Sequence, residues 1–510
     1  MTTAATRTSS AYDSLLVASR DVGLLDSIGG LLGWDQETMM PEGGAEYRAR
    51  QLALLARYRH ERFTAERTGE LLEECESSMD VSADTVEAAN LRALRHDYDR
   101  AVRLPSSLVE EIASTASHAQ HEWMEARANN DFDRFRPTLE KTIELCRRKA
   151  ECFGWAEDGE AWDALAEDYE PGCTAAGVAE VFGPLRSRLQ VLLNEIRDSG
   201  VTIDDHLDRI ELPRDQQMAM CRFISEELGF DFNRGRLDVS THPFCGGSHC
   251  DDVRMTTRFH DAMMTDALGS TMHEAGHAIY EQGLRFDHVG TPMGSAVSLG
   301  IHESQSRMWE NQVGRSEAFW EWCAPKLEQF FGSATAGTNP QSAYKTINRV
   351  QPGLIRVEAD EATYNMHVMI RFELERGLLS GDLPVADIPG EWNRLYKEYL
   401  GVTVPDDAHG CLQDIHWSMG ALGYFPTYTL GNLYCAQFFE TAMDALPGLA
   451  DDFRVGRFER LRTWLNEEIH QHGRRYSPSE LCVRVTGKEL SADPLMRHLE
   501  GKLRPLYGLS

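Results

Sequence analysis

The stretch GSTMHEAGHAIYEQG, residues 269–283, places two histidines four residues apart, with a glutamate directly after the first. Met, Ala, Ile and Tyr recur around them at three- and four-residue spacing, which predicts a helix. Residues i and i+4 share one face of a helix, so His273 and His277 can both turn an imidazole towards one metal ion. Glu274 is then placed to take a proton from a water molecule at that ion. The alternative interpretation is two surface histidines on an acidic helix.

Two histidines require at least one more protein ligand if a zinc ion is to keep an open position for water. The stretch SLGIHESQSRMWEN, residues 298–311, contains Glu303, which lies 26 residues after His277. Glycine and proline are frequent between residues 285 and 300, which predicts a turn followed by a second helix that runs back. Glu303 is therefore a candidate third ligand, and its neighbour His302 competes with it.

Most of the remaining chain has the apolar spacing of helices, for example in residues 45–76 and 137–155. No linker, charge block or internal repeat divides it. We therefore predict a mainly α fold in one large domain, 1–510, with a helical part at about 1–230 and a catalytic part at about 231–510.

The exception to the helical pattern precedes the histidine motif. The segments RLDVS, residues 236–240, and VRMTTRF, residues 253–259, have the composition of strands and flank a Gly-Gly pair. They predict a small antiparallel β-hairpin next to the helix of the histidine motif. The segment between them, CGGSHC, also contains Cys245, His249 and Cys250. These three residues could form a second metal site, although a Gly-rich turn is the simpler interpretation.

The composition limits the classes of partner. The 510 residues carry a formal net charge of −30, which argues against nucleic acid and anionic membranes as main partners. The chain has only seven lysines against 44 arginines. Acidic excess with few lysines is typical of proteins from salt-loving organisms, in which salt screens the self-repulsion. An ordinary acidic cytosolic protein from a GC-rich genome has the same composition.

The expected location is the cytoplasm. The first residues, MTTAATRTSSAYDSLL, lack a basic start followed by an apolar run, and no stretch is apolar enough for a membrane helix. The eleven cysteines are odd in number and scattered, so a disulfide framework is not expected.

Several motifs together resemble the M32 metallocarboxypeptidases, the carboxypeptidase Taq family. HEAGH followed by GIHESQSRMWEN carries the resemblance. WDQETMMP, HPF and DVRMT precede the histidine motif, and IRVEAD, GCLQDIHW and GYFPTY follow it, all in the order of the family between Trp34 and Tyr428.

This resemblance implies a helical, saddle-like fold with a deep groove and a gluzincin-type active site, usually in a homodimer. It implies one divalent metal ion per subunit, zinc by default, with cobalt able to replace it. It also implies removal of single amino acids from the free C-terminus of peptides with broad specificity. Carried over to this chain, the metal ligands are His273, His277 and Glu303, and the general acid/base is Glu274.

An enzyme that cleaves at a free C-terminus has to recognise a carboxylate, and the planar fork of an arginine suits that role. Arg356, in IRVEAD, is the first candidate, and Arg254 and Arg349 are the others. A structural salt bridge is the alternative for each of them. His242, in HPF, could line the groove or cap its own loop.

The reaction also needs a donor for the developing oxyanion besides the metal. His416 and a tyrosine of GYFPTY, either Tyr424 or Tyr428, are the candidates, and a hydroxyl can donate without being charged. The alternative is that these aromatic side chains only wall the groove. Asp360 or Glu361 could accept a hydrogen bond from the second nitrogen of a ligand histidine. Residues 309–311, the WEN trio, are expected to pack rather than to take part in chemistry.

Two other functions compete with the carboxypeptidase. A zinc oligopeptidase or endopeptidase could use the same metal core without the carboxylate anchor. A helical binding scaffold with a metal-free site is the second alternative, and the intact His-Glu-x-x-His motif with Glu303 argues against it.

Overall fold

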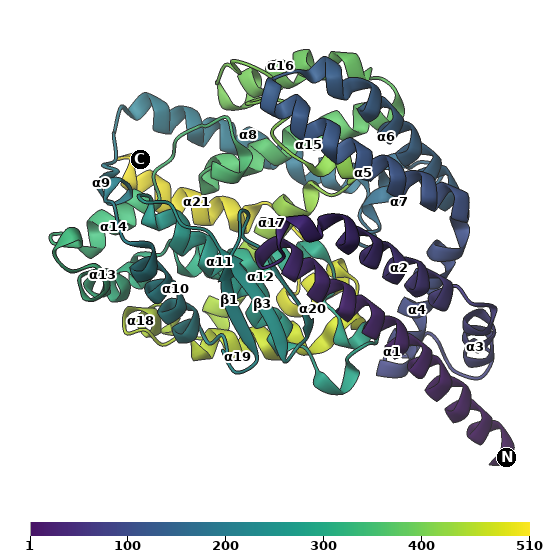
Figure 1. The fold of residues 1–510 in the computed structure, drawn as a ribbon. Coiled ribbons are helices and arrows are strands. Elements are labelled where there is room, and N and C mark those ends of the chain that lie inside the picture. The colour runs from purple at the N-terminus through teal and green to yellow at the C-terminus, as the bar shows by residue number, and fades with distance from the viewer. Residues whose placement is uncertain (1, 510) are drawn as a thin grey trace. The chain divides into compact units, whose positions relative to one another are not determined.

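The computed structural model of the protein describes residues 2–509, with side chains described from residue 11. The predicted domain 1–510 therefore includes two residues, Met1 and Ser510, that lie outside the described chain. Helices dominate the described residues, as predicted from the apolar spacing (Figure 1). None of the helices in residues 2–509 combines the length and apolar character needed to span a bilayer.

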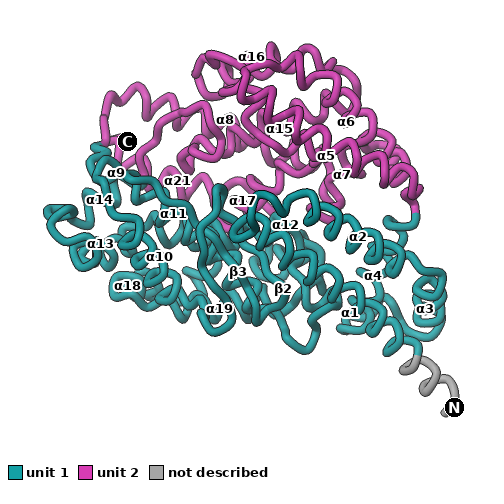
Figure 2. The backbone as a smooth tube through the Cα atoms, viewed as in Figure 1, with its two compact units in different colours: residues 1–102, 204–347, 438–489 teal, residues 103–203, 348–437, 490–510 magenta. Residues whose placement is uncertain are grey.

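The chain forms two compact units, and each unit is assembled from three separate segments (Figure 2). Unit 1 contains residues 1–102, 204–347 and 438–489. Unit 2 contains residues 103–203, 348–437 and 490–510. The predicted boundary near residue 230 falls inside the second segment of unit 1, and the single-domain organisation stays a prediction.

Unit 1 holds the only sheet in residues 2–509 together with most of the helices. The helices of unit 1, apart from the last residue of α4, are α1 (Thr2–Thr38), α2 (Ala45–Phe63), α3 (Glu66–Glu76), α4 (Val86–Arg103), α9 (His206–Arg209), α10 (Arg214–Leu228), α11 (Met264–Gly283), α12 (Leu299–Arg307), α13 (Glu317–Phe331), α14 (Pro340–Ile347), α18 (Leu449–Arg454), α19 (Glu459–Glu468) and α20 (Pro478–Thr486).

The sheet has three strands in the order β1-β3-β2, which are β1 (Gly235–Val239), β2 (Cys245–His249) and β3 (Asp252–Thr257). An antiparallel hairpin does lie beside the histidine helix, but it is formed by β2 and β3, which pair with Cys245 opposite Met255, and β2 lies where the sequence predicts the turn. The pairing predicted between the first and last segments is wrong, because β1 and β3 are parallel, with Leu237 opposite Met255.

The Gly-Gly pair explains this difference. It is not a turn but the middle of β2, and the tight turn follows His249. A Cβ atom at Gly247 would lie 2.3 Å from the carbonyl oxygen of Asp252, so the glycine allows β2 to approach β3 closely. The chain therefore uses residues 240–244 to cross from one side of β3 to the other.

The sheet fixes the position of α11. Val253 and Met255 of β3 are buried, and the strand packs against this helix. At the end of the strand, the hydroxyl of Thr271 donates to the hydroxyl of Thr257 at 2.8 Å. The helix of the histidine motif thus packs against β3 rather than standing free.

Unit 2 consists of helices packed around α15 (Glu361–Ser380), in which fifteen residues are buried. The side chain of Asp360 caps this helix by accepting hydrogen bonds from the backbone N–H groups of Ala362 and Thr363. The other helices are α5 (Ser106–Asn129), α6 (Phe132–Phe153), α7 (Ala161–Ala166), α8 (Ala175–Ser199), α16 (Ile388–Leu400) and α21 (Asp493–Leu506), and α17 (Pro426–Ala445) runs from unit 2 into unit 1.

Candidate active-site residues

Three potential metal ligands converge in unit 1 from two helices. The Nε2 atoms of His273 and His277, both on α11, lie 3.6 and 3.4 Å from Oε2 of Glu303 on α12. Tetrahedral zinc with bonds of about 2.0–2.1 Å separates its ligand atoms by roughly 3.3 Å. The three side chains therefore fit a tetrahedral ion of this size, with a fourth position for water.

A close approach of α11 and α12 brings Glu303 to the histidines. The glycine of HEAGH, Gly276, makes this approach possible, because a Cβ atom there would lie 2.4 Å from the carbonyl oxygen of Gln305 and 2.6 Å from the Cα of Ser306. The glycine inside the histidine motif thus sets the distance between the two ligand-bearing helices.

The second nitrogen of each candidate ligand histidine is hydrogen bonded. Nδ1 of His273 lies 2.8 Å from Oε2 of Glu310, and Nδ1 of His277 lies 2.5 Å from Nδ1 of His302. Nε2 of His302 in turn lies 2.7 Å from Oε1 of Glu281. Partners of this kind fix the ring orientation and leave both Nε2 atoms turned towards Oε2 of Glu303, where a metal ion would bind. Since both ring nitrogens of His302 are engaged, Glu303 rather than His302 faces the imidazoles.

One arginine holds the two carboxylates of this centre. Arg307 donates through Nε to Oε1 of Glu303 at 2.7 Å and through Nη1 to Oε2 of Glu310 at 2.9 Å. Burial alone would raise the pKa of Glu310, but Arg307 and His273 lower it to about 2. The carboxylate of Glu303 is kept ionised in the same way, so its second oxygen, Oε2, can serve as a ligand.

The glutamate of the motif has a different environment. Glu274 is 6% exposed, and its carboxylate makes no hydrogen bond to any residue between 11 and 509. Burial is the main cause that raises its pKa, to about 7. Because the carboxylate has no hydrogen bond to these residues, it is available to a water molecule.

A second polar cluster lies in unit 2 and contains Arg356. Two buried guanidinium groups share one carboxylate there: Nη2 of Arg356 lies 2.8 Å from Oδ1 of Asp414, and Nε of Arg371 lies 2.7 Å from Oδ2. Arg356 also donates to the hydroxyl of Tyr364 at 3.0 Å. Burial opposes the ionised form of Asp414, but the two arginines hold its pKa well below the usual range. The three groups together carry one net positive charge.

His416 and the two tyrosines of GYFPTY belong to the same cluster. The guanidinium of Arg356 lies 4.9 Å from the ring centre of Tyr428, whose hydroxyl is 3.4 Å from Nε2 of His416. The rings of His416 and Tyr424 have centroids 5.2 Å apart. Burial, together with Arg356, lowers the pKa of His416 to about 4, so this imidazole is neutral at neutral pH and can donate a hydrogen bond without being charged.

Comparisons with known proteins agree over nearly the whole chain. Residues 14–503 match the family model described as carboxypeptidase Taq (M32) metallopeptidase. The chain belongs to the M32 metallocarboxypeptidase family. Thermostable carboxypeptidase 1 of Thermus thermophilus is 43% identical over 98% of the chain and 99% of the relative, and carboxypeptidase 1 of Bacillus subtilis is 35% identical over 94% and 95%.

Solved structures support the same membership. An M32 carboxypeptidase from Deinococcus radiodurans has a TM-score of 0.94 and 42% identity, over 98% of this chain and all of the other. The M32 resemblance and the mainly α fold expected from the sequence are therefore confirmed, and the protein is a metallocarboxypeptidase. Membership implies a metal ion, and His273, His277 and Glu303 are the candidate ligands for one.

The other predicted M32 residues have different surroundings. Arg254, on β3, is bonded to both carboxylate oxygens of Asp252, at 2.9 and 3.1 Å, and its guanidinium lies 4.4 Å from the ring centre of Trp34. His242 is exposed in the turn before β2. Arg349 is half-buried in the coil that follows α14.

The sequence-based candidates for the hydrogen-bond partner of a candidate ligand histidine, Asp360 and Glu361, are wrong. Neither Asp360 nor Glu361 has this role, because Asp360 caps α15 and Glu361 pairs with His498 and Lys502. Glu310 is the acceptor, although residues 309–311 were expected only to pack. After α12 the backbone widens into a π-helical turn, Met308–Val313, which carries Glu310 back to His273. The available signal was its spacing of seven residues from Glu303, two helical turns along one face.

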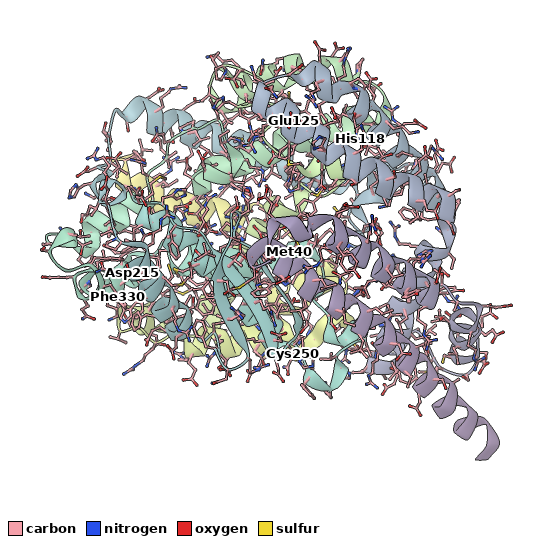
Figure 3. The ribbon with its side chains drawn as sticks, viewed as in Figure 1. Met40, His118, Glu125, Asp215, Cys250 and Phe330 are labelled. Carbon is pink, nitrogen blue, oxygen red and sulfur yellow. The ribbon has the colours of Figure 1, made fainter. Side chains whose placement is uncertain are left out.

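The second possible metal site of the sequence receives little support. His249, Cys250 and Asp251 do lie together where β2 turns into β3, and Cys250 marks this end of the sheet (Figure 3). However, Nδ1 of His249 already accepts from the backbone N–H of Asp251 at 3.0 Å, and Asp251 pairs with Arg234. Cys245 is not part of this group.

Replacing Glu310 by glutamine tests its role as an orienting group. We expect metal affinity to fall by about 10- to 100-fold, because the amide can no longer accept a charge-assisted hydrogen bond from His273. Competition with a chelator measures the dissociation constant. Glu317→Gln, at an exposed position of α13, is the matched control. Equal metal affinity in Glu310→Gln and wild type would contradict this role.

Proposed function

We propose that this metallocarboxypeptidase is a zinc enzyme that releases single amino acids from the C-terminus of peptides with broad specificity. The observation that supports it is the convergence of Nε2 of His273, Nε2 of His277 and Oε2 of Glu303. Two imidazoles and one carboxylate with an open fourth position form a donor set typical of catalytic zinc. Cobalt would be accepted by the same ligands.

When bound, the metal would polarise the scissile carbonyl group and lower the pKa of a water molecule that it holds. Glu274 would take the proton from this water as the water attacks, and would then deliver the proton to the departing amine. A carboxylate without another hydrogen-bond partner suits this transfer. His273, His277 and Glu303 keep their orientation through Glu310, His302 and Arg307.

Arg356 is the proposed anchor for the free C-terminal carboxylate of the substrate. Its five N–H groups have three bonds, to Asp414 and Tyr364, and it belongs to a group with one positive charge in excess. A substrate carboxylate would balance this excess. Arg254 is less suited, because Asp252 already neutralises it one to one. His242 keeps only a lining role in this proposal.

His416 is the proposed donor to the oxyanion, together with Tyr424 or Tyr428. The imidazole and the tyrosine hydroxyls are neutral donors, so they can stabilise a developing negative charge without the cost of a buried positive charge on themselves. The close contact between the hydroxyl of Tyr428 and His416 supports a joint role.

A zinc oligopeptidase or endopeptidase with the same metal core is the alternative. One experiment separates the two functions: mass spectrometry of the products from a peptide with a free C-terminus and from its C-terminally amidated form. Metal-depleted protein is compared with protein resupplied with zinc or cobalt. We expect stepwise loss of C-terminal residues from the free acid and only slow cleavage of the amidated peptide, with both absent after depletion and restored by either metal. Equal cleavage of both peptides would favour the alternative, and full activity without metal would contradict both.

Three further features remain proposals from the resemblance and the composition. We propose a homodimer, which sedimentation analysis would test, and a cytoplasmic location, which cell fractionation would test. The acidic, lysine-poor composition suggests adaptation to high salt. Full activity without added salt would contradict this proposed adaptation.

A further inference from the structure

The long loop between α16 and α17 carries two of the proposed oxyanion donors, His416 and Tyr424, whereas Tyr428 lies in the first turn of α17. It spans residues 401–425, and its one helical turn in the described chain is the short 3-10 helix His416–Met419. A loop of this length holds a side chain in one place only if other elements fix its backbone. Two successive turns of α15 fix this loop.

The first turn holds the part of the loop that precedes His416. Arg371 donates to Oδ2 of Asp414 at 2.7 Å and to the side-chain oxygen of Gln413 at 2.8 Å. Arg371 is fully buried. The contact therefore sets the start of the segment that leads to the imidazole.

The next turn holds the parts of the loop that follow His416. Glu375 lies four residues after Arg371, on the same face of the helix. Its Oε1 accepts from the indole Nε1 of Trp417 at 3.1 Å. Its Oε2 accepts from the backbone N–H of Gly423 at 3.0 Å and from the indole Nε1 of Trp162 on α7 at 3.2 Å. Trp417 directly follows His416, and Gly423 directly precedes Tyr424.

These three contacts require a hydrogen-bond acceptor at each of the two terminal atoms of the side chain at position 375. All three partners are N–H donors, and a carboxylate accepts through both of its oxygens. The side chain of Glu375 has no exposed surface, and this burial raises its pKa to about 7 against the effect of the donors. An apolar side chain would avoid the cost of burying a carboxyl group, but it would leave three buried donors without acceptors.

The backbone at Gly423 has little room to move. Its φ is +87°, and a Cβ atom there would lie 2.7 Å from the backbone nitrogen of Ala166 on α7. The same short helix carries Trp162. Gly423 is therefore enclosed between α7 and the carboxylate of Glu375. A displacement of this carboxylate would move the backbone of Gly423 and with it the adjoining Tyr424.

We propose that Glu375 is a positioning residue that clamps the loop through Trp417 and Gly423 and thereby sets His416 and Tyr424 for the reaction. This inference rests on the proposed function of these two side chains. Glu375 does not touch the substrate. It acts on turnover only through the loop.

Glu375→Gln is the test, because glutamine has the same shape but presents an NH2 group to one of the two sets of donors. We expect kcat to fall by about 10- to 100-fold with KM and bound metal unchanged, as for a small misplacement of a catalytic group. The indole N–H signals of Trp162 or Trp417, assigned by single Trp→Phe variants, are expected to shift in the NMR spectrum. Glu480→Gln is the matched control, since the carboxylate of Glu480 also accepts a backbone N–H group, from Ser477 at 2.8 Å, at the start of α20.

A double-mutant comparison separates positioning from a general loss of structure. In a protein that already carries His416→Ala and Tyr424→Phe, Glu375→Gln is expected to change kcat by less than about twofold, because the groups that it positions are absent. An equal loss of kcat in both backgrounds would overturn the proposal, and so would unshifted indole signals or an unchanged kcat in an active enzyme. A wild-type protein that releases no C-terminal residues would instead contradict the proposed function and this role with it.

Discussion

Replacing Glu274 by glutamine should lower kcat by about 10³-fold or more while the protein keeps its metal. General acid–base groups contribute about 10²- to 10⁴-fold, and here one group serves both proton transfers. The metal should remain because Glu274 has no hydrogen bond to His273, His277 or Glu303 and is not one of the converging ligands. Steady-state kinetics and elemental analysis of the same preparation measure the two effects.

The control for this substitution is Glu303→Gln. It changes a glutamate of equal burial, and it should remove the metal together with the activity. If Glu274→Gln also lost its metal, Glu274 would have a structural role. If Glu274→Gln kept its turnover, another base would have to be found.

Arg356→Ala should remove the preference for a free C-terminus. A charge-assisted hydrogen bond contributes about 1.5–3 kcal/mol, so kcat/KM for the free acid should fall by about 100-fold. The amidated peptide offers no carboxylate, so its slow cleavage should change little. The ratio of the two kcat/KM values should therefore approach one, which a general loss of folded protein would not produce.

The same substitution should destabilise unit 2. Breaking a buried ion pair costs about 3–5 kcal/mol, and the lower value of about 3 kcal/mol is expected because Arg371 still pairs with Asp414. Arg147→Ala is a useful control, since Arg147 donates to backbone carbonyl groups of Leu378 and Leu379 in the same unit. It should lower thermal stability without changing the acid-to-amide ratio. A preserved ratio in Arg356→Ala would move the anchor to another arginine.

The convergence of the three candidate metal ligands could be anticipated in part from the sequence because some of their geometry is local, whereas the choice of Glu303 over His302 came from the M32 resemblance. Four residues on a helix place His273 beside His277, and a glycine-rich turn allows a second helix to return with Glu303. Composition identifies β1 and β3 as strands, but it predicts a turn where β2 lies and an antiparallel pairing between β1 and β3 that is wrong. Whether β1 lies parallel or antiparallel to β3 depends on how the chain crosses the sheet, and residues 240–244 carry no signal for that crossing.

The groups that support the site could not be predicted, because their partners are distant in the sequence. Asp414 is 58 residues from Arg356, and three donors from two distant parts of the chain, α7 and the loop 401–425, meet at Glu375. No spacing rule connects such residues. The spacing of Glu310, seven residues after Glu303, was a usable signal. The π-helical turn Met308–Val313, on which Glu310 lies, could not be predicted from that spacing.

The interleaved order of segments limits how the protein can be dissected. The chain passes between the two units five times, so no continuous fragment contains either unit without also containing residues of the other. Truncation therefore cannot yield the metal ligands or the Arg356 cluster as a clean, independently expressed piece. Attempts to assign activity or metal uptake to one half must rely on point substitutions in the intact polypeptide.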